Sequence, residues 1–382
     1  MSRNKSSIVL VSICLINFIG LYYKAIWLKE TSTSQNLNTR EKRSLNKINY
    51  RLPLNLKPFF YEIQLQPFIG PSSTYGNRSF TTIGTTIIHF TCQTQTDKVY
   101  FHAKNLSIDS LRLNSNDDYQ NEVLTNSFVY DSQKDYGIVS LKTNCITGID
   151  YSLTIKYKGL INEQFGLYKS SYKDKNGTTH YLAITQFEPS DARRVFPCFD
   201  EPAMKAQFQL KIIRHKNFTA SHFNTPLLTS LAYQNDSDWF VDTFERTVKM
   251  STYLVGFVVS NFKSIKMSSP KYGINTEIVA RPEAIDNGMG ETALKEAVKI
   301  IDFFVDYFNV TYPLKKISHI AVPDFFAGAM ENWGVVIYRE RYLLFDPIVD
   351  SFDDKKRIFE VIYHEVAHQW VNILHLINVF NY

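Results

Sequence analysis

Short apolar runs alternate with polar turns along the chain between about residues 50 and 262. The runs are rich in Ile, Val, Thr, Phe and Tyr, which is typical of half-buried strands. No fixed repeat period is visible among them. The pattern predicts an all-β sandwich or saddle, with strands at residues 60–65, 85–90, 98–103, 138–141, 151–157, 206–213, 244–248 and 254–259.

The hydrophobic pattern changes after about residue 262. Residues 291–308 place apolar side chains at helical spacing, and a second helix is expected from Asp353. Strand-like stretches lie between the two helices, at 317–322 and 334–338. The chain is therefore predicted to be multidomain, with an all-β domain at 51–262 and a mixed α/β domain at 263–382.

An apolar run at residues 8–23 contains no Asp, Glu, Lys or Arg, and basic residues flank it on both sides. Its sixteen residues are short for a membrane span, which needs about 17–25, but the preceding serines or residues 25–28 extend it. We expect a cytoplasmic tail and signal-anchor helix at 1–29, followed by a polar stalk at 30–50. A cleaved signal peptide and a buried core helix are the alternatives.

The composition is that of a globular protein. The chain has 382 residues, of which 44% are hydrophobic and 21% charged, which argues against disorder and against a multi-span membrane protein. The net charge is +5, but residues 1–60 hold ten Lys and Arg against two acids, so the remainder carries a net charge of −3. The body of the chain has no basic stripe with interleaved aromatic residues, and nucleic-acid binding is therefore not expected.

Six N-glycosylation sequons follow the apolar run, at Asn77, Asn105, Asn176, Asn217, Asn235 and Asn309. Together they suggest an extracytoplasmic body. We therefore expect a glycoprotein with a single transmembrane helix, of type II orientation, in the plasma membrane or the secretory pathway.

Cysteine is sparse, so the chain is not a disulfide scaffold. Cys14 lies in the apolar run. Cys92 and Cys145 both lie in strand-like segments and are the candidates for a disulfide bond. Cys198 is then expected to be free and buried.

The strongest chemical signal is the sequence His364-Glu365-Val366-Ala367-His368. On a helix, positions four residues apart share a face, so both imidazoles can reach one Zn²⁺ ion. Glu365 lies about 100° around the helix, where it can act as a general base without ligating the metal. The alternative is a pair of ordinary surface or core histidines.

Two further motifs carry acidic residues in unusual settings. Residues 328–334 (GAMENWG) form a glycine-bounded turn before a strand, and the edge of that strand could pair with an extended peptide. On its own, Glu331 is either a cation-binding residue or a surface acid. Residues 186–202 (QFEPSDARRVFPCFDEP) mix charges with Phe and Pro. In this segment Glu188 is the functional candidate, and a salt-bridged loop is expected of Asp191, Arg193, Arg194, Asp200 and Glu201.

In this order, the three motifs resemble those of the membrane alanyl aminopeptidase family, the aminopeptidase N type of gluzincin zinc metallopeptidases. The resemblance extends from about residue 50 to residue 370, and it is specific because the GAMEN stretch, a HExxH helix 33 residues after its Glu, and the PCFDEP stretch occur together. It implies a β-saddle N-terminal domain and an incomplete thermolysin-like α/β catalytic domain. It also implies the removal of single residues from the N-termini of peptides.

The resemblance implies a role for each matching residue. His364 and His368 would be ligands of one Zn²⁺ ion, and Glu365 the general base. Glu331 would hold the free α-amine of the peptide substrate, with Glu188 as its partner carboxylate. The remaining substrate-binding residues would be Gly328 and Ala329, through their backbone, and Gln186, as a wall of the first side-chain pocket. A homodimer is a further expectation for a full-length form.

The sequence departs from the family near its printed end. The third zinc ligand implied by the family is a glutamate that would fall five residues beyond Tyr382, and residues 371–382 do not match the family pattern. His375 does not have the spacing of a replacement ligand. We expect a truncated gene model or a short splice product, inactive as printed. The alternative function is a non-catalytic, membrane-tethered ectodomain that binds peptides or a partner protein.

Overall fold

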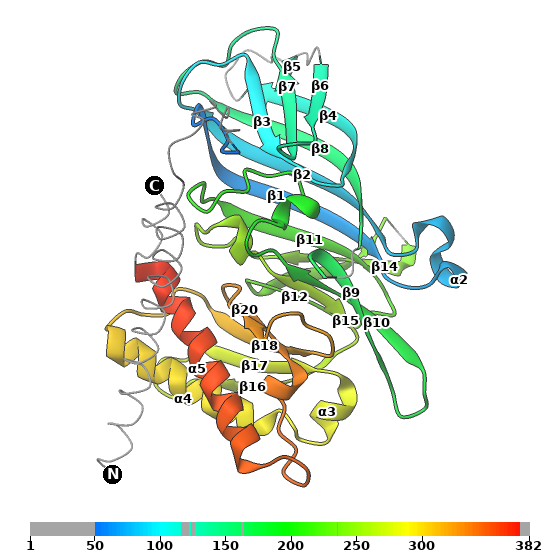
Figure 1. Ribbon diagram of the computed structural model, residues 1–382, viewed down its shortest axis with the longest axis vertical. Coiled ribbons are helices and arrows are strands. Elements are labelled where there is room, and N and C mark those ends of the chain that lie inside the picture. The colour runs from blue at the N-terminus through cyan, green and yellow to red at the C-terminus, as the bar shows by residue number, and fades with distance from the viewer. Residues whose placement is uncertain (1–49, 116–121, 124–126, 162–163, 235, 375–382) are drawn as a thin grey trace, which may run out of the picture. The chain divides into compact units, whose positions relative to one another are not determined.

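The computed structural model describes residues 50–115, 122–123, 127–161, 164–234 and 236–374 (Figure 1). The expected signal anchor, together with Cys14, Asn235 and His375, lies outside the described residues. Within those ranges, no helix combines the length and hydrophobicity that a transmembrane span requires.

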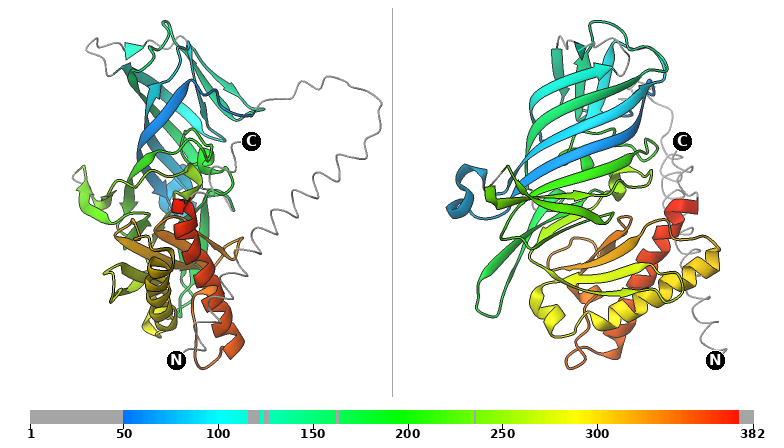
Figure 2. Two further views of the ribbon diagram at one scale, coloured as in Figure 1. Left: turned by 90° about the vertical axis from the view of Figure 1, so that its left-hand side faces the viewer. Right: turned by 180° about the vertical axis from the view of Figure 1, so that it is seen from behind.

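The largest sheet has eight strands in the order β13-β14-β11-β1-β2-β8-β4-β5 (Figure 2). β1 and β11 run parallel, while β2 pairs with both β1 and β8 in antiparallel register. Alternate side chains along β1 and β2 are buried, as the period of two predicts. The strands are β1 (Leu56–Phe68), β2 (Thr81–Cys92), β4 (Ser107–Ser115), β5 (Glu122–Val123), β8 (Asp150–Leu160), β11 (Gln207–His215), β13 (Leu227–Tyr233) and β14 (Asp236–Phe244).

Two smaller sheets complete the β-rich part. A three-stranded sheet has the order β3-β7-β6, formed by β3 (Lys98–His102), β7 (Tyr136–Ser140) and β6 (Ser127–Asp131). A four-stranded sheet has the order β12-β15-β10-β9, formed by β12 (Ala220–Phe223), β15 (Phe257–Ser260), β10 (Thr179–Gln186) and β9 (Gly166–Lys173). The expected disulfide bond between Cys92 and Cys145 is confirmed, and Cys198 is free and buried.

The last sheet is mixed and has five strands in the order β16-β17-β18-β20-β19. β18 runs parallel to both β17 and β20, whereas the short strand β19 runs antiparallel to β20. These elements are β16 (Lys263–Ser268), β17 (Asn275–Ala280), β18 (Lys316–Val322), β19 (Ala329–Met330) and β20 (Val335–Arg339), with helices α3 (Pro282–Asp286), α4 (Glu291–Phe308) and α5 (Phe352–Leu374). Short helical turns lie elsewhere, at α2 (Ser72–Tyr75), η1 (Gly76–Arg78), η2 (Ala192–Arg194), η3 (Thr252–Leu254) and η4 (Glu340–Tyr342).

Helix α5 is fixed by one apolar stripe and by its N-terminal cap. Its side chains at four-residue spacing have no exposed surface, namely Ile358, Ile362, Val366 and Trp370. The Trp370 ring lies 5.8 Å from that of Phe304 and 6.3 Å from that of Phe308, both on α4. At the other end, the Ser351 hydroxyl accepts from the backbone N–H of Asp354 at 3.2 Å, and the Asp354 carboxylate accepts from the Ser351 N–H at 3.0 Å.

Most predicted elements are confirmed, including the helix at 291–308, which matches the bounds of α4. The strand predicted at 244–248 is wrong, because β14 ends at Phe244. Beyond it, the Thr247 N–H donates to the Phe208 carbonyl at 2.9 Å, but the Phe208 N–H donates to the Thr247 hydroxyl, also at 2.9 Å, so a side chain takes one of the two backbone hydrogen bonds of a strand pair. The strand predicted at 254–259 begins only at Phe257, because η3 occupies residues 252–254.

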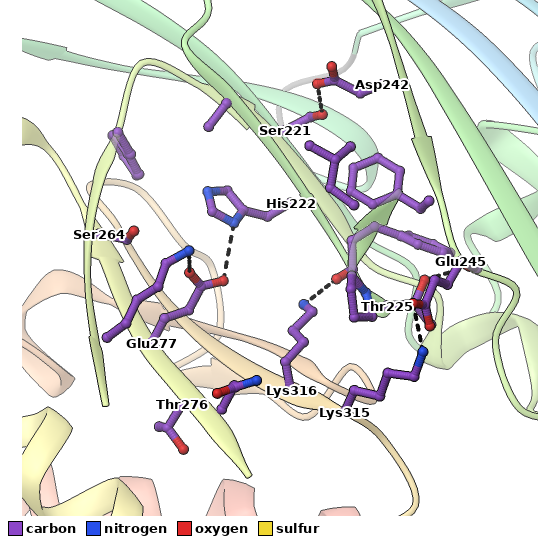
Figure 3. A pocket seen from close by; sticks show the side chains of 18 of the residues that line it. Ser221, His222, Thr225, Asp242, Glu245, Ser264, Thr276, Glu277, Lys315 and Lys316 are labelled. Carbon is purple, nitrogen blue, oxygen red and sulfur yellow. Dashed lines mark hydrogen bonds and ion pairs between the residues drawn. The ribbon is translucent and has the colours of Figure 1, made fainter. Parts of the chain in front are cut away.

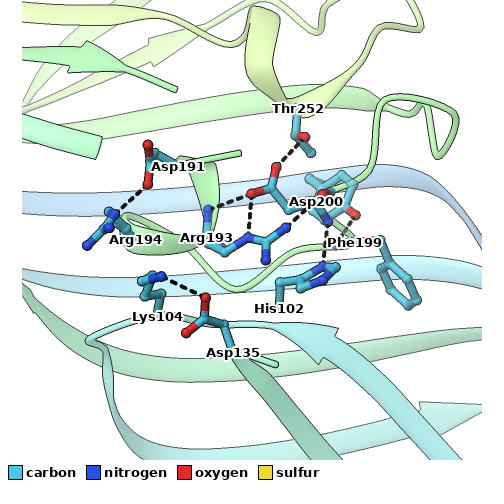
Figure 4. Close-up of polar contacts among 10 residues, drawn as sticks. His102, Lys104, Asp135, Asp191, Arg193, Arg194, Phe199, Asp200 and Thr252 are labelled. Atoms are coloured by element: carbon cyan, nitrogen blue, oxygen red, sulfur yellow. Dashed lines mark hydrogen bonds and ion pairs between the residues drawn. The ribbon is translucent and has the colours of Figure 1, made fainter. Parts of the chain in front are cut away.

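The expected salt-bridged loop at 191–201 is confirmed (Figure 4). Arg193 Nε donates to Asp200 Oδ2 at 2.9 Å, and the Thr252 hydroxyl donates to Asp200 Oδ1 at 2.6 Å. The Asp200 N–H donates to His102 Nδ1 at 3.2 Å. Asp200, only 4% exposed, therefore ties β3 and η3 to this loop. Arg194 pairs with Asp191, and Glu201 with Arg51 at 3.3 Å.

We predict that His102 makes folding stability dependent on pH. Burial, and then the charge of Arg193, lowers the pKa of His102 to about 3. Between about pH 6.5 and pH 3 the unfolded chain therefore binds a proton that the folded chain does not, and stability falls as the pH falls, by up to about 1.4 kcal/mol per pH unit. His102→Gln keeps an acceptor for the Asp200 N–H but cannot titrate.

Urea unfolding of both proteins at several pH values between 7 and 4 measures this effect. The difference in unfolding free energy between the wild type and His102→Gln should shift in favour of the variant as the pH falls. Parallel curves for the two proteins would contradict the assignment.

Candidate active site

Helix α5 brings the two histidines of the HEVAH motif together. The Nε2 atoms of His364 and His368 lie 3.0 Å apart, with the rings at an interplanar angle of 74°. Burial lowers the pKa of both imidazoles to about 4, and at His364 the neighbouring His368 adds to this effect. Both rings are therefore neutral near pH 7, the form in which imidazole can donate a lone pair to a metal.

The donor pair fits a zinc ion as two of its ligands. Zinc binds imidazole nitrogen at about 2.0–2.1 Å, so two Nε2 atoms at 3.0 Å can contact the same cation. In the part of the chain that the structure describes, no group of three or more His, Cys, Asp or Glu residues could hold a metal. The described residues therefore supply a pair of ligands rather than a full set.

Glu365 lies between the two histidines in the sequence of α5 and is buried. The residue is 5% exposed, and its Oε2 atom has no hydrogen-bond partner among the described residues. Burial, and then the charges of Glu331 and Glu188, raises its pKa well above the usual value. Tyr338 of β20 lies nearby: burial, and then the charge of Glu365, raises the pKa of the Tyr338 hydroxyl. A buried carboxylate without a partner is costly, and such groups mark functional sites.

Glu331 comes from the turn that follows β19, the last strand of its sheet. Its Oε1 atom lies 3.8 Å from Nδ1 of His368, and burial raises its pKa. Upstream, Gly328 is exposed and its carbonyl accepts from the Arg339 N–H at 3.0 Å, while Ala329 pairs with Tyr338. Glu331 thus lies beside the histidines, with the edge strand β19 leading to it.

Gln186 and Glu188 reach the same region from the end of β10. The Gln186 Nε2 atom contacts the Met330 sulfur at 3.8 Å, and its Oε1 atom is buried without a partner among the described residues. Glu188 is exposed as a whole, yet partial burial of its carboxyl group and the charge of Glu331 raise its pKa to about 7. Segments about 140 residues apart in the sequence therefore meet at one site.

The sequence analysis missed three buried amide side chains that hold this site. Gln369 is fully buried and bonds to the backbone of Glu331 and Gly334. The Asn224 Nδ2 atom donates to the carbonyls of Trp333 at 2.7 Å and Leu254 at 2.8 Å. Asn332 donates to the Val255 carbonyl at 3.2 Å. Gln369 directly follows the second histidine, and Asn332 is in the GAMEN motif, so position alone could have flagged both.

A separate cavity of about 850 Å³ is lined by β12, by residues of β11 and β14, and by β16, β17 and the start of β18 (Figure 3). Its charged side chains pair with one another, as Arg214 with Asp242 at 2.6 Å and Lys266 with Glu277 at 3.3 Å. The buried Lys316 ammonium donates to the Gly334 carbonyl at 2.9 Å. These charged groups are thus paired within the protein, and Lys316 adds a contact to the turn at Gly334.

Comparison with known proteins agrees with this arrangement. Residues 57–254 match the Peptidase M1 N-terminal domain, and residues 292–374 match the Peptidase family M1 domain. The chain is 38% identical to the aminopeptidase N of Oryctolagus cuniculus over 360 residues, which are 93% of this chain and 36% of that protein.

Two human proteins are similarly close. The chain is 38% identical to the aminopeptidase N of Homo sapiens over 340 residues, 87% of this chain and 34% of that protein. It is 37% identical to the endoplasmic reticulum aminopeptidase 1 of Homo sapiens over 348 residues, 90% of this chain and 35% of that protein. The chain thus spans about a third of the length of these curated relatives.

We predict that Gly334→Ala destabilises the protein far more than Gly177→Ala. Both glycines have a left-handed backbone, with φ of 81° and 79°. A Cβ atom at Gly177 would meet open space, whereas at Gly334 it would overlap the backbone oxygen of Asn224. The shared φ strain costs about 1–2 kcal/mol, and the overlap should add about 1–3 kcal/mol for Gly334→Ala alone.

Thermal and urea unfolding of the two variants beside the wild type tests this expectation. Equal losses of stability in the two variants would mean that the turn at Gly334 is not tightly held.

Proposed function

Because this chain belongs to peptidase family M1, we propose that it carries the amine-binding and metal-binding residues of a zinc-dependent aminopeptidase, which removes single residues from the N-termini of peptides. The observation that carries the proposal is the meeting of Glu331 with the imidazole pair, at 3.8 Å from His368. A carboxylate that binds the N-terminal ammonium group beside a metal site places the first peptide bond of the substrate at the metal.

In this proposal His364 and His368 hold the zinc ion, and a third ligand lies outside the described residues. When bound, the cation would act as a Lewis acid on the scissile carbonyl. Glu365 takes a proton from the attacking water and delivers it to the leaving amine. Its raised pKa and buried, unpartnered oxygen suit a group that gains and loses a proton.

Glu331 and Glu188 bind the free α-ammonium group of the substrate. Each raises the pKa of Glu365, so the three carboxylates lie within electrostatic reach of one another. A cation arriving among them relieves this repulsion, which gives the site a preference for a charged N-terminus. A second ammonium-binding carboxylate also fixes the direction of the chain.

The remaining contacts orient the peptide. The backbone at Gly328 and Ala329 would bond to the extended peptide, which joins β19 as an added strand. Gln186 would line the pocket of the first side chain, and as a neutral group it disfavours acidic N-terminal residues.

We extend the proposal to the architecture and location of the protein. The β-rich part to about residue 262 would be the saddle domain, and the mixed sheet with α4 and α5 would belong to a thermolysin-like catalytic domain. The sequon asparagines at positions 77, 105, 176, 217 and 309 are exposed, which supports a glycosylated, extracytoplasmic body anchored by residues 8–23. A homodimer of the full-length form remains part of the proposal.

The edge strand β19 and the carboxylates beside the histidines also suit a second function. A form of the protein that does not bind zinc would keep both features and would bind peptides or a partner protein without cleaving them. Hydrolysis of an aminoacyl amide by the full-length protein, as its transcript encodes it, separates the two functions.

We predict that Glu365→Gln lowers kcat by about 100- to 10,000-fold, because it removes a general base but keeps the shape of the side chain. Zinc content, measured by metal analysis, should stay unchanged because Glu365 is not a ligand. The matched control is Glu360→Gln on the exposed face of the same helix, where the side chain is 53% exposed and pairs with Lys356. Activity of Glu365→Gln equal to that of the control would refute the assigned role.

We predict that Glu331→Gln raises KM for peptides with a free N-terminus by about 10- to 100-fold, because a charge-assisted hydrogen bond to the ammonium group is lost. Steady-state kinetics on a dipeptide amide measures the change. An unchanged KM, with a folded and zinc-loaded variant, would remove Glu331 from the amine site.

A further inference from the structure

The segment that carries Glu331 leads into a four-residue turn, residues 332–335, in which the Asn332 carbonyl accepts from the Val335 N–H at 3.0 Å. The side-chain amide of Gln369 adds two contacts to this segment, one to the carbonyl of Glu331 and one to the N–H of Gly334. Its Nε2 atom donates to the Glu331 carbonyl at 3.1 Å, and its Oε1 atom accepts from the Gly334 N–H at 3.0 Å.

The chemistry of these contacts requires an amide at position 369. One partner is an acceptor and the other a donor, so the side chain must offer both kinds of group at once. Gln369 has no exposed surface, so water cannot take its place. The Tyr312 hydroxyl donates to the same Oε1 atom at 3.2 Å and completes the environment of that oxygen.

Gln369 is also the only residue between His368 and the large buried anchor Trp370. The Trp370 ring is held in place by a hydrogen bond, in which its Nε1 atom donates to the Val310 carbonyl at 2.9 Å. The amide of Gln369 therefore moves with the histidine pair, and its two hydrogen bonds transmit the position of α5 to Glu331.

We propose that Gln369 is a positioning residue that sets the distance between the ammonium-binding carboxylate of Glu331 and the metal-binding histidines. The inference rests on the proposed aminopeptidase function and adds to it a residue that touches neither substrate nor metal. Displacement of the turn by the loss of this amide would weaken binding of the substrate's amine while leaving the histidine pair in place.

The test compares two hydroxamate ligands that differ in one group: an amino-acid hydroxamate with a free α-amine, and its des-amino analogue. The full-length, zinc-loaded protein is titrated with each, and the ratio of the two dissociation constants measures recognition of the amine. The main variant is Gln369→Met, which has a similar volume and no amide. The matched control is Tyr312→Phe, which removes a hydrogen bond to the same oxygen and leaves the turn contacts intact.

We expect the preference for the amine-bearing ligand to fall at least tenfold in Gln369→Met and to change less than twofold in Tyr312→Phe. Affinity for the des-amino ligand should change less than threefold in both, and zinc content should match the wild type. Where Gln369→Met does not fold, Gln369→Asn takes its place, since it keeps the amide but withdraws it by one methylene.

Other outcomes overturn the inference. Equal weakening of both ligands, or failure of both position-369 variants to fold, would mean that Gln369 supports the structure in general. A wild-type protein that binds both ligands equally would overturn the proposed function itself, before any variant is considered. If the wild type prefers the amine-bearing ligand and Gln369→Met keeps that preference, only the proposed role of Gln369 is overturned.

Discussion

Three carboxyl groups share one partly buried site. The electrostatic repulsion between them is the constraint on which the rest of the structure depends. Burial raises the pKa of Glu188, Glu331 and Glu365. The charge of Glu331 raises the pKa of Glu188 further, and the charges of Glu331 and Glu188 raise that of Glu365. Left to relax, such groups would separate or take up water. They stay together because each is attached to a rigid element: the end of β10, the turn after β19, and the buried face of α5.

The turn that follows Glu331 is held rigid by contacts from two different sheets. The segments that follow β12 and precede β15, both in the four-stranded sheet, supply Asn224 and the backbone of residues 254–256, and the five-stranded sheet supplies Lys316. The buried pair of Arg193 and Asp200 holds η3, which precedes that backbone segment. The β-rich part is therefore a structural support of the site as well as the source of Gln186 and Glu188. A site of like charges needs such support, since strain at one point must be held by contacts elsewhere.

Much of this could be predicted from local sequence pattern, and the remainder depends on distant contacts. Helices α4 and α5 follow from apolar positions at helical spacing, and the HEVAH pair from the same geometry. The hairpin of β9 and β10 was missed, because its outer residues around Asp174 are polar and its pairing has no clean alternation. Gln369 was missed because its partners lie 35 and 38 residues away, and a lone glutamine carries no periodic signal.

Asn224 links two segments of the gene that could otherwise be inherited separately. It lies before residue 262, whereas one of its carbonyl partners, Trp333, lies beyond it. A recombination event with its junction between these positions would join an amide from one parent to a turn from another. Because Asn224 is 1% exposed and bonds in three directions, a mismatch there leaves buried polar groups unsatisfied. A chimaera joined near residue 262 whose first parent lacks an amide at position 224 would therefore leave the Trp333 carbonyl of the second parent without its buried donor.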